Sequence, residues 1–378
     1  MSASGVSSAS SASKPSGSLA GYRPELRPRV LLSDPLLDGA ATVHLIKDTG
    51  SGNSFKVGPK EHFLIARMDG GRSLAEIGEE YAGEYGRRLA DAHWQQILTM
   101  LGTKGLLAGT PVPPAPAPTA ERPTLLRGTL PLVADADATT ARLHRFFGFL
   151  LSPWAMVPLL VLVLAMEAVV VARSGELLLA VRELFTNPVL LTGTAILLWV
   201  STALHELAHG VVARHYGGQV SEIGLRWRLP VVIMYCTVDN YLYLGRRRHR
   251  IATAVAGAVM NLLFLLPFCA LWLFAPLDHA THEAVSALLL LGSVQAFAML
   301  VPLPPLDGYK IASQLAGATG LAASAGGYLR LALRRSPHAA TYPSRARIAY
   351  PAYALGTVLV LAAVVAAAVA GAHHLLTA

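Results

Sequence analysis

One short run in this sequence has the residue types and spacing for metal chemistry, namely His205-Glu206-Leu207-Ala208-His209. On a helix, side chains four residues apart project from the same face, so both imidazoles can bind one metal ion. Tetrahedral zinc takes two such nitrogens, and Glu206 can then hold and deprotonate a water molecule. The run lies within the apolar stretch 190–213, where ionisable residues are costly and mark a functional site by default. The alternative is that these side chains have only a structural role, as polar groups that find their hydrogen-bond partners inside a helical bundle.

A catalytic zinc site needs a third protein ligand, for which the sequence offers two candidates. His215 lies ten residues after His205, which is about 15 Å along an unbroken helix, and the β-branched Val212 is poor at turning the chain back. Asp307 follows a proline-rich break at the end of another apolar stretch, and Gly308 beside it allows an unusual backbone angle. Both apolar stretches run in the same direction, so His205 and Asp307 should reach a similar depth. We therefore favour Asp307, with a helix-capping aspartate at the inner interface as the alternative.

The composition predicts a membrane protein with several spans. Hydrophobic residues make up 53% of the chain and charged residues 14%, well below the roughly 25% that is usual in soluble domains. The apolar residues gather in five long runs, 146–172, 188–213, 251–274, 284–301 and 350–370. We therefore expect a multi-pass α-helical protein with about five transmembrane helices in a lipid bilayer.

The basic residues between these runs predict the orientation. Arginine and lysine gather before the first run, between the second and third, and between the fourth and fifth, and few lie in the opposite connections. By the positive-inside rule the N-terminus is cytosolic and the C-terminus outside, in a plasma membrane. The net charge of +8 thus sets topology and does not indicate a nucleic-acid partner. Glu167, near the outer end of the first run, is expected to reach the interface.

The first third of the chain predicts a tail and a small α+β domain. Residues 1–28, rich in serine and alanine at their start, form a disordered tail, and residues 29–109 a compact domain. Strands are expected at 41–47 and 54–57, and helices at 60–68, 73–85 and 90–102, the second of which begins with a Ser73–Glu76 capping box. This order is typical of a small winged-helix fold. Residues 110–141 form a Pro/Ala-rich linker, and 142–378 the membrane domain.

The segments FLIARMDGGRSLAEIGEEYAGEYG and ILTMLGTKGLLAG resemble the PqqD-like domains, which hold the leader peptides of ribosomally made peptides. The alternatives are a winged helix that binds DNA and a winged helix that has only a structural role in the enzyme. Acidic residues on the middle helix argue against DNA, because phosphate contacts need a basic face; they are Glu76, Glu79, Glu80 and Glu84.

HELAH together with PLPPLDG, on two inward-running membrane helices, resembles the site-two protease family of intramembrane zinc metalloproteases, in its branch of peptide zinc metalloproteases. The resemblance implies zinc on His205, His209 and Asp307, Glu206 as general base, and a small sheet inserted between two spans. Asn261 matches an asparagine of the family's AGPxxN motif, while Ala258 replaces the proline.

Substrate binding departs from the family pattern. The family's asparagine before LDG is missing here, where Met299 and Val301 stand, so substrate fixing must come from elsewhere, such as Asn261. Tyr309 and Lys310 follow the carboxylate closely and either contact substrate carbonyls or anchor the segment at the interface.

These residues predict peptide-bond hydrolysis near the cytosolic side, with removal of a leader from a precursor peptide captured by residues 29–109. Cleavage of a membrane-anchored regulator is one alternative, and a non-catalytic scaffold or immunity protein that binds peptide is another; a zinc transporter fits less well. The strand-like stretch 231–244 either pairs with substrate by β-addition or is an ordinary re-entrant hairpin. The outward histidines are expected to be surface residues; they are His279, His282, His373 and His374.

Overall fold

The computed structural model describes residues 19–111, 124–228 and 231–377. Most of the predicted disordered tail, and residues 112–123 of the predicted Pro/Ala-rich linker, therefore lie outside the described residues. The chain packs as two units. Residues 33–43 belong to the second unit, although they lie between the two parts of the first.

The first unit contains two short strands of its own, most of a third, and three helices. The strands are β1 (Val30–Leu32), β3 (Ala41–Asp48) and β4 (Ser54–Val57), with β3 in the middle and antiparallel to both others. The helices are α1 (Pro59–Ile65), α2 (Leu74–Tyr85) and α3 (Asp91–Thr103), preceded by the turn η1 (Leu19–Gly21). The elements occur in the predicted order, and the winged-helix assignment remains a prediction.

Local sequence explains how these helices begin and pack. The Ser73 side chain accepts from the Glu76 amide while the Glu76 carboxylate accepts from the Ser73 amide, so the predicted capping box is present. The apolar faces of the helices then close over the sheet, burying a core that includes Ile46, Ile65 and Leu101. This unit has a hydrophobic core of its own.

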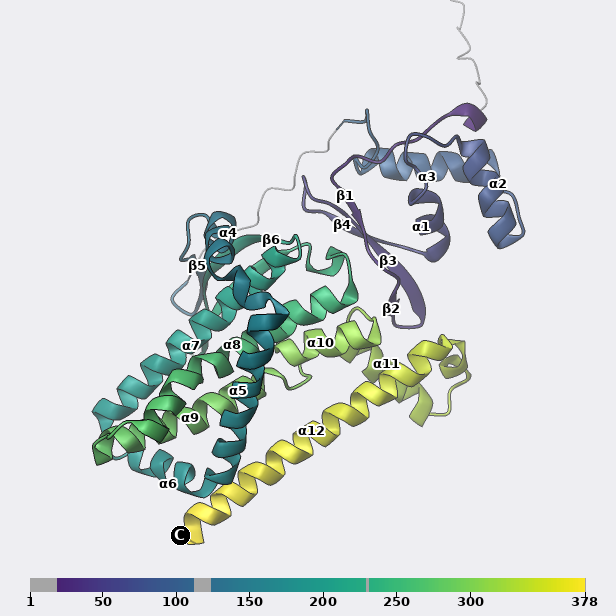
Figure 1. The fold of residues 1–378 in the computed structure, drawn as a ribbon. Helices are drawn as coiled ribbons and strands as arrows, with labels where there is room; N and C mark the ends of the chain where they lie inside the picture. The colour runs from purple at the N-terminus through teal and green to yellow at the C-terminus, as the bar shows by residue number, and fades with distance from the viewer. Residues whose placement is uncertain (1–18, 112–123, 229–230, 378) are drawn as a thin grey trace, which may run out of the picture. The chain divides into compact units, whose positions relative to one another are not determined.

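The second unit contains five helices long and apolar enough to cross a membrane (Figure 1). They are α5 (Pro153–Ala172), α7 (Pro188–His215), α8 (Arg247–Phe274), α9 (His279–Met299) and α12 (Ser344–Thr377). The five predicted spans are thereby confirmed by length and composition. Helices α7, α8 and α9 pack against one another, and the side chains buried between α5, α8 and α9 form the largest apolar core of this unit.

Shorter helices connect these spans. Before α5 come α4 (Ala136–Phe147) and η2 (Gly148–Leu151), and between α5 and α7 lies α6 (Ser174–Leu184). After α9 come α10 (Asp307–Ala316), α11 (Leu321–Leu333) and η4 (Pro337–Thr341). None of them was predicted as a separate helix, and α4 begins inside the predicted linker.

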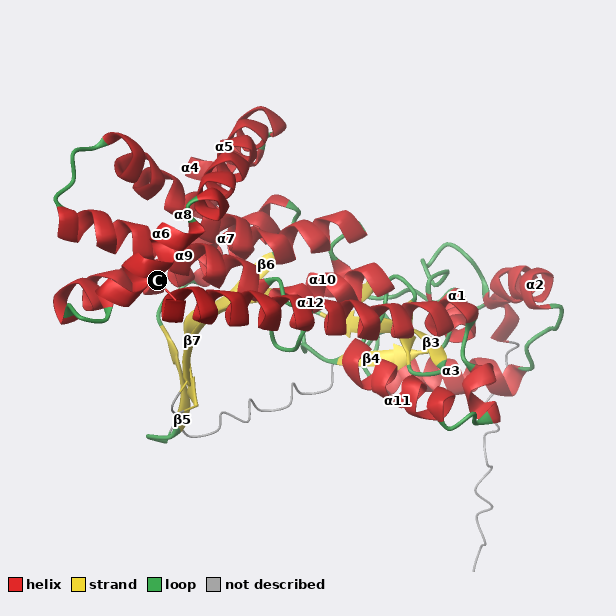
Figure 2. Cartoon of the chain, turned by 90° about the horizontal axis from the view of Figure 1, so that it is seen from below, coloured by secondary structure: helices red, strands yellow, loops and turns green. Residues whose placement is uncertain are grey.

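The second unit contains an antiparallel sheet of three strands, two of which lie between α7 and α8 in the chain while the third precedes α4 (Figure 2). Its strands are β5 (Arg127–Pro131), β6 (Gln219–Arg228) and β7 (Val231–Asp239), with β6 in the centre. The predicted strand 231–244 is confirmed through Asp239. There Asn240 takes a positive φ of 57° and the chain turns into η3 (Tyr241–Tyr243). In the described part of the chain β7 is an edge strand, so no strand pairs with the outer side of its backbone.

A small hairpin completes the second unit. β2 (Leu36–Asp38) pairs with the first residues of β3, and Leu37 is buried against α11 and α12. The rest of β3 continues into the first unit, so one strand contributes to both.

Candidate metal centre

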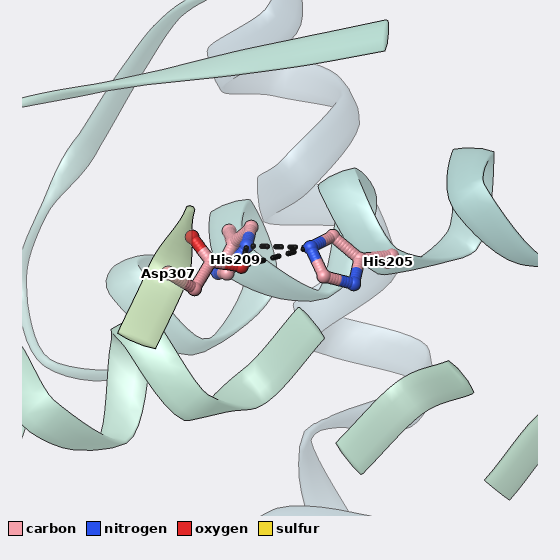
Figure 3. A group of neighbouring side chains, drawn as sticks. All are labelled: His205, His209 and Asp307. Carbon is pink, nitrogen blue, oxygen red and sulfur yellow. Dashed lines mark hydrogen bonds and ion pairs between the residues drawn. The ribbon is translucent and has the colours of Figure 1, made fainter. Parts of the chain in front are cut away.

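His205, His209 and Asp307 converge on one buried point (Figure 3). The Oδ2 atom of Asp307 lies 2.9 Å from His205 Nε2 and 3.0 Å from His209 Nε2, and the two Nε2 atoms are 3.2 Å apart. None of the three residues is more than 5% exposed. The structure thus brings together the three residues that the sequence predicted as ligands, across about a hundred residues of chain.

Two helices place these side chains. The histidines lie one turn apart on α7, with their rings nearly perpendicular at 87°. Asp307 is the first residue of α10, just after the proline-rich break. The sequence argument expected Gly308 to supply an unusual backbone angle, and that reason is wrong. Gly308 is helical, and a Cβ there would overlap the Leu300 carbonyl, so glycine lets α10 begin against the end of α9.

The hydrogen bond at the far side of the His209 ring fixes its protonation. Nδ1 lies 2.7 Å from the carbonyl oxygen of Thr253, which can only accept, so Nδ1 carries the proton. In the neutral ring, Nε2 then has only a lone pair, and this lone pair faces a carboxylate oxygen of Asp307. Two acceptors at such a distance need a proton or a metal cation between them, and the donor set is suited to bind a metal ion.

The separations of the donor atoms fit zinc. Tetrahedral ligands at about 2.0–2.1 Å from zinc lie roughly 3.3 Å from one another, close to the three separations at this centre. Two imidazole nitrogens and one carboxylate leave a fourth position open, as in catalytic zinc sites. His205, His209 and Asp307 are therefore the residues that would hold the ion.

Glu206 lies next to the ligands and is held by the sheet. Its Oε2 atom accepts from the backbone amide of Cys236 on β7 at 2.9 Å, and the side chain is half-buried. Burial and the negative charge of Glu206 raise the pKa of the Cys236 thiol to about 12. The thiol is therefore protonated at neutral pH.

The predicted substrate-binding residues lie in three different settings. Asn261 is 1% exposed; its Oδ1 accepts from Ser201, and its Nδ2 has no partner among the described residues. Lys310 donates to Asp307 Oδ1 at 2.8 Å and so holds the second oxygen of the carboxylate. The Tyr309 hydroxyl accepts from the amide of Ala322 on α11, away from the ligands.

Several contacts at the centre could not be read from the sequence. The Thr253 carbonyl and the Cys236 amide are backbone groups, whose use as partners leaves no mark in residue type. Gly257 matters because a side chain there would overlap the His205 ring. The only sequence signal for the role of Gly257 was its position, four residues before Asn261 within an apolar stretch.

Other polar residues considered in the sequence lie apart from this centre. His215 bonds to His144 at 3.1 Å on the surface and does not contact the ligands. Glu167 accepts from Ser293 of α9 at 2.8 Å and is half-buried, facing a neighbouring helix. Of the outward histidines, His279 is 90% exposed in its side chain, whereas the ring of His282 stacks on Trp272.

The five apolar helices and the buried donor set are compatible with a membrane metalloprotease. In agreement, the model of Peptidase family M50 matches residues 193–288, which include the HELAH run, the β6–β7 hairpin and Asn261. Proteases of that family depend on zinc. Asp307 lies beyond the matched residues, so its place at the centre rests on the structure. No curated protein and no solved structure matches the chain.

Proposed function

We propose that this chain is a zinc endopeptidase of the site-two type that hydrolyses a peptide bond near the cytosolic side of the plasma membrane. The observation that carries the proposal is the convergence of His205, His209 and Asp307 from two helices, with Glu206 beside them. A transporter would not need a carboxylate held in place next to the metal ligands.

Glu206 is the general base in this proposal. A bound zinc ion supplies Lewis acidity toward the scissile carbonyl and toward water. Glu206 takes the proton of the attacking water and passes it to the leaving amine. The Cys236 amide holds one carboxylate oxygen of Glu206, which leaves the other oxygen free for this proton transfer.

The open edge of β7 is suited to hold the substrate. Cys236 points its amide away from β6 and toward Glu206. Because strand residues alternate in direction, Met234 also points its amide and carbonyl toward the open edge. A substrate strand that pairs there would be extended, as proteolysis requires, and would run beside the general base.

Asn261 supplies a donor for the substrate in this proposal. It lies four residues after Gly257, which contacts His205, and therefore on the same face of α8. Its unpartnered Nδ2 can donate to a substrate carbonyl or to the developing oxyanion. This would replace the asparagine that the family carries before LDG.

For the substrate, we propose a precursor peptide whose leader is bound by the first unit. The compact core of that unit and its acidic α2 fit peptide better than nucleic acid. The positive-inside pattern supports a cytosolic location for this unit, where ribosomal peptides are made. A membrane-anchored regulator is the second candidate substrate; it would need no peptide-binding unit.

The substitution Glu206→Gln tests the chemistry. We expect zinc to remain bound and cleavage to fall by about 10²–10⁴-fold, the usual contribution of a general base. Zinc content and cleavage of a candidate precursor, followed by mass spectrometry, measure the two effects. Cleavage at the wild-type rate would rule out the assignment, and full biological function without cleavage would favour a scaffold.

Deletion of residues 44–110 tests leader capture. It spares residues 33–43, which pack with the membrane unit. We expect a higher KM for the full-length precursor and little change for a short peptide around the cleavage site. An unchanged KM for the precursor would exclude leader capture, and unchanged zinc content would show that the membrane unit is intact.

A further inference from the structure

Arg250, in the first turn of α8, is 5% exposed, and each of its three guanidinium nitrogens donates a hydrogen bond. Nε donates to Gln314 Oε1 at 2.8 Å, and Nη1 donates to the carbonyls of Leu242 and Leu244 at 3.2 and 2.9 Å. Nη2 donates to Asp34 Oδ2 at 2.6 Å. One buried cation thus joins α8, α10, the segment after β7 and the hairpin at residues 33–43.

Both helices that Arg250 joins reach the metal centre. Gln314, 3% exposed, lies two turns after Asp307 on the same face of α10. On α8, Arg250 lies three residues before Thr253, whose carbonyl accepts from His209. A displacement of Arg250 would therefore act on the carboxylate ligand and on one imidazole ligand together.

The hairpin holds the other end of α10. The Leu37 amide donates to the Gly317 carbonyl at 2.8 Å, and the Thr319 amide donates to the Leu37 carbonyl at 2.9 Å. Gly317 is the C-cap of α10, and Leu37 is 3% exposed in the core that α11 and α12 share. The hairpin therefore binds the C-terminal end of α10, the helix that begins with Asp307.

We propose that Arg250 is a positioning residue for the metal-binding carboxylate, and that Asp34 is its counter-ion. In this view residues 33–43 are a working part of the peptidase, although in the chain they lie between the two parts of the first unit. The inference rests on the proposed metal centre. Outer residues that orient metal ligands typically change metal affinity about 10–100-fold when they are replaced.

The test is the zinc affinity of the full-length Asp34→Asn variant in detergent, with the zinc ion alone as the probe and a chelator as competitor. The Asp34 side chain is 59% exposed, so this variant should fold. We expect zinc to bind about tenfold more weakly, and Asp34→Glu to restore part of the loss. The control is Arg248→Gln, because Arg248 is exposed on the same helical turn, and we expect it to bind zinc as the wild type does.

The cobalt-substituted protein gives a second readout. We expect the visible absorption of bound Co²⁺ to change in Asp34→Asn and not in Arg248→Gln. Wild-type zinc affinity in Asp34→Asn would overturn the proposal, even if its melting temperature fell, because a purely structural contact changes stability alone. Absence of zinc binding in the wild type would instead overturn the proposed metal centre.

The variant Arg250→Gln completes a double-mutant cycle. Glutamine cannot make all four hydrogen bonds of the guanidinium group. If Asp34 acts through Arg250, Asp34→Asn should weaken zinc binding no further in the Arg250→Gln background. Additive losses would show that Asp34 does not act through Arg250 and would overturn its role as counter-ion. If Arg250→Gln does not fold, the single Asp34→Asn variant still decides the proposal.

Discussion

At the scale of single residues, each of the three proposed metal ligands is oriented by a second contact. Thr253 fixes the His209 ring, Lys310 holds the second oxygen of Asp307, and Gly257 leaves room for His205. Partners of this kind fix the tautomer and the angle of a ligand before the ion arrives. The centre is therefore arranged in advance by groups that bear no metal themselves.

Gly257→Ala should weaken metal binding about 10–100-fold. The added methyl group would overlap the His205 ring, which cannot move away without leaving its ligand position. Chelator competition measures the effect. Gly193→Ala is the matched control, because a Cβ at this glycine of α7 meets no atom within 4 Å. Equal zinc affinities for the two variants would contradict the role given to Gly257.

His62 should make the first unit less stable in mild acid. Burial, together with the neighbouring His44 ring stacked 3.6 Å away, lowers the pKa of His62 from 6.5 to about 4. Between these values the unfolded chain binds more protons than the folded one, so stability is full above pH 6.5 and falls toward pH 4. Hydrogen exchange of α1 amides at pH 7 and pH 5, corrected for intrinsic rates, measures this loss.

The control for that experiment is His62→Gln, which removes the titrating group. Its α1 protection should change less between pH 7 and pH 5 than that of the wild type. Equal changes in the two proteins would show that another group governs the acid sensitivity of the unit.

Residue types predicted the ligands but not what orients them. The HELAH spacing fixes two imidazoles on one helix face, and the proline break before Asp307 indicates a special backbone. Arg250 was read only as a topology signal because an arginine beside a span has that role by default. Its counter-ion Asp34 lies more than two hundred residues away in the chain.

At the scale of elements, the edge strand β7 connects fold and chemistry. It packs beside α7, and its Cys236 amide holds Glu206. The sequence left open whether this stretch is a plain hairpin or a strand that pairs with substrate. Its place at the edge of the sheet, next to the proposed general base Glu206, favours substrate pairing as a proposal.

Met234→Pro should raise KM with little loss of zinc. Proline removes the Met234 amide on the open edge, and an edge strand tolerates this change because no ladder hydrogen bond to β6 is lost. Cleavage kinetics and zinc content measure the two effects. Ile233→Pro, by contrast, removes an amide that faces β6, and should disturb the sheet itself. A wild-type KM in Met234→Pro would argue against β-addition.

The elements that sequence reasoning missed depend on their neighbours. β5 is a strand only because β6 pairs with it, and its surroundings in the sequence resemble a linker. Helix α6 is short and carries charges, so its sequence is typical of a loop that connects two spans. The long spans and the helices of the first unit were predicted because hydrophobic periodicity and caps are local signals.

At the scale of the whole molecule, the distribution of arginine and lysine predicts on which side of the membrane the proposed metal centre lies. The positive-inside pattern predicts that the ends of α7 and α9 near the ligands face the cytosol. Cysteine variants in a background without Cys236 and Cys269 test this prediction. A membrane-impermeant maleimide added to intact cells should label His279→Cys and not Arg248→Cys. The reverse pattern would invert the orientation and place hydrolysis outside.

The most direct test of the account is the zinc content of the purified full-length protein and of its Asp307→Ala variant, measured by mass spectrometry of the metal. The account predicts one zinc ion per wild-type chain, retained in Glu206→Gln and lost or weakened at least a hundredfold in Asp307→Ala, because a buried ligand has been removed. Asp307→Ala that binds zinc as tightly as the wild type would contradict the account.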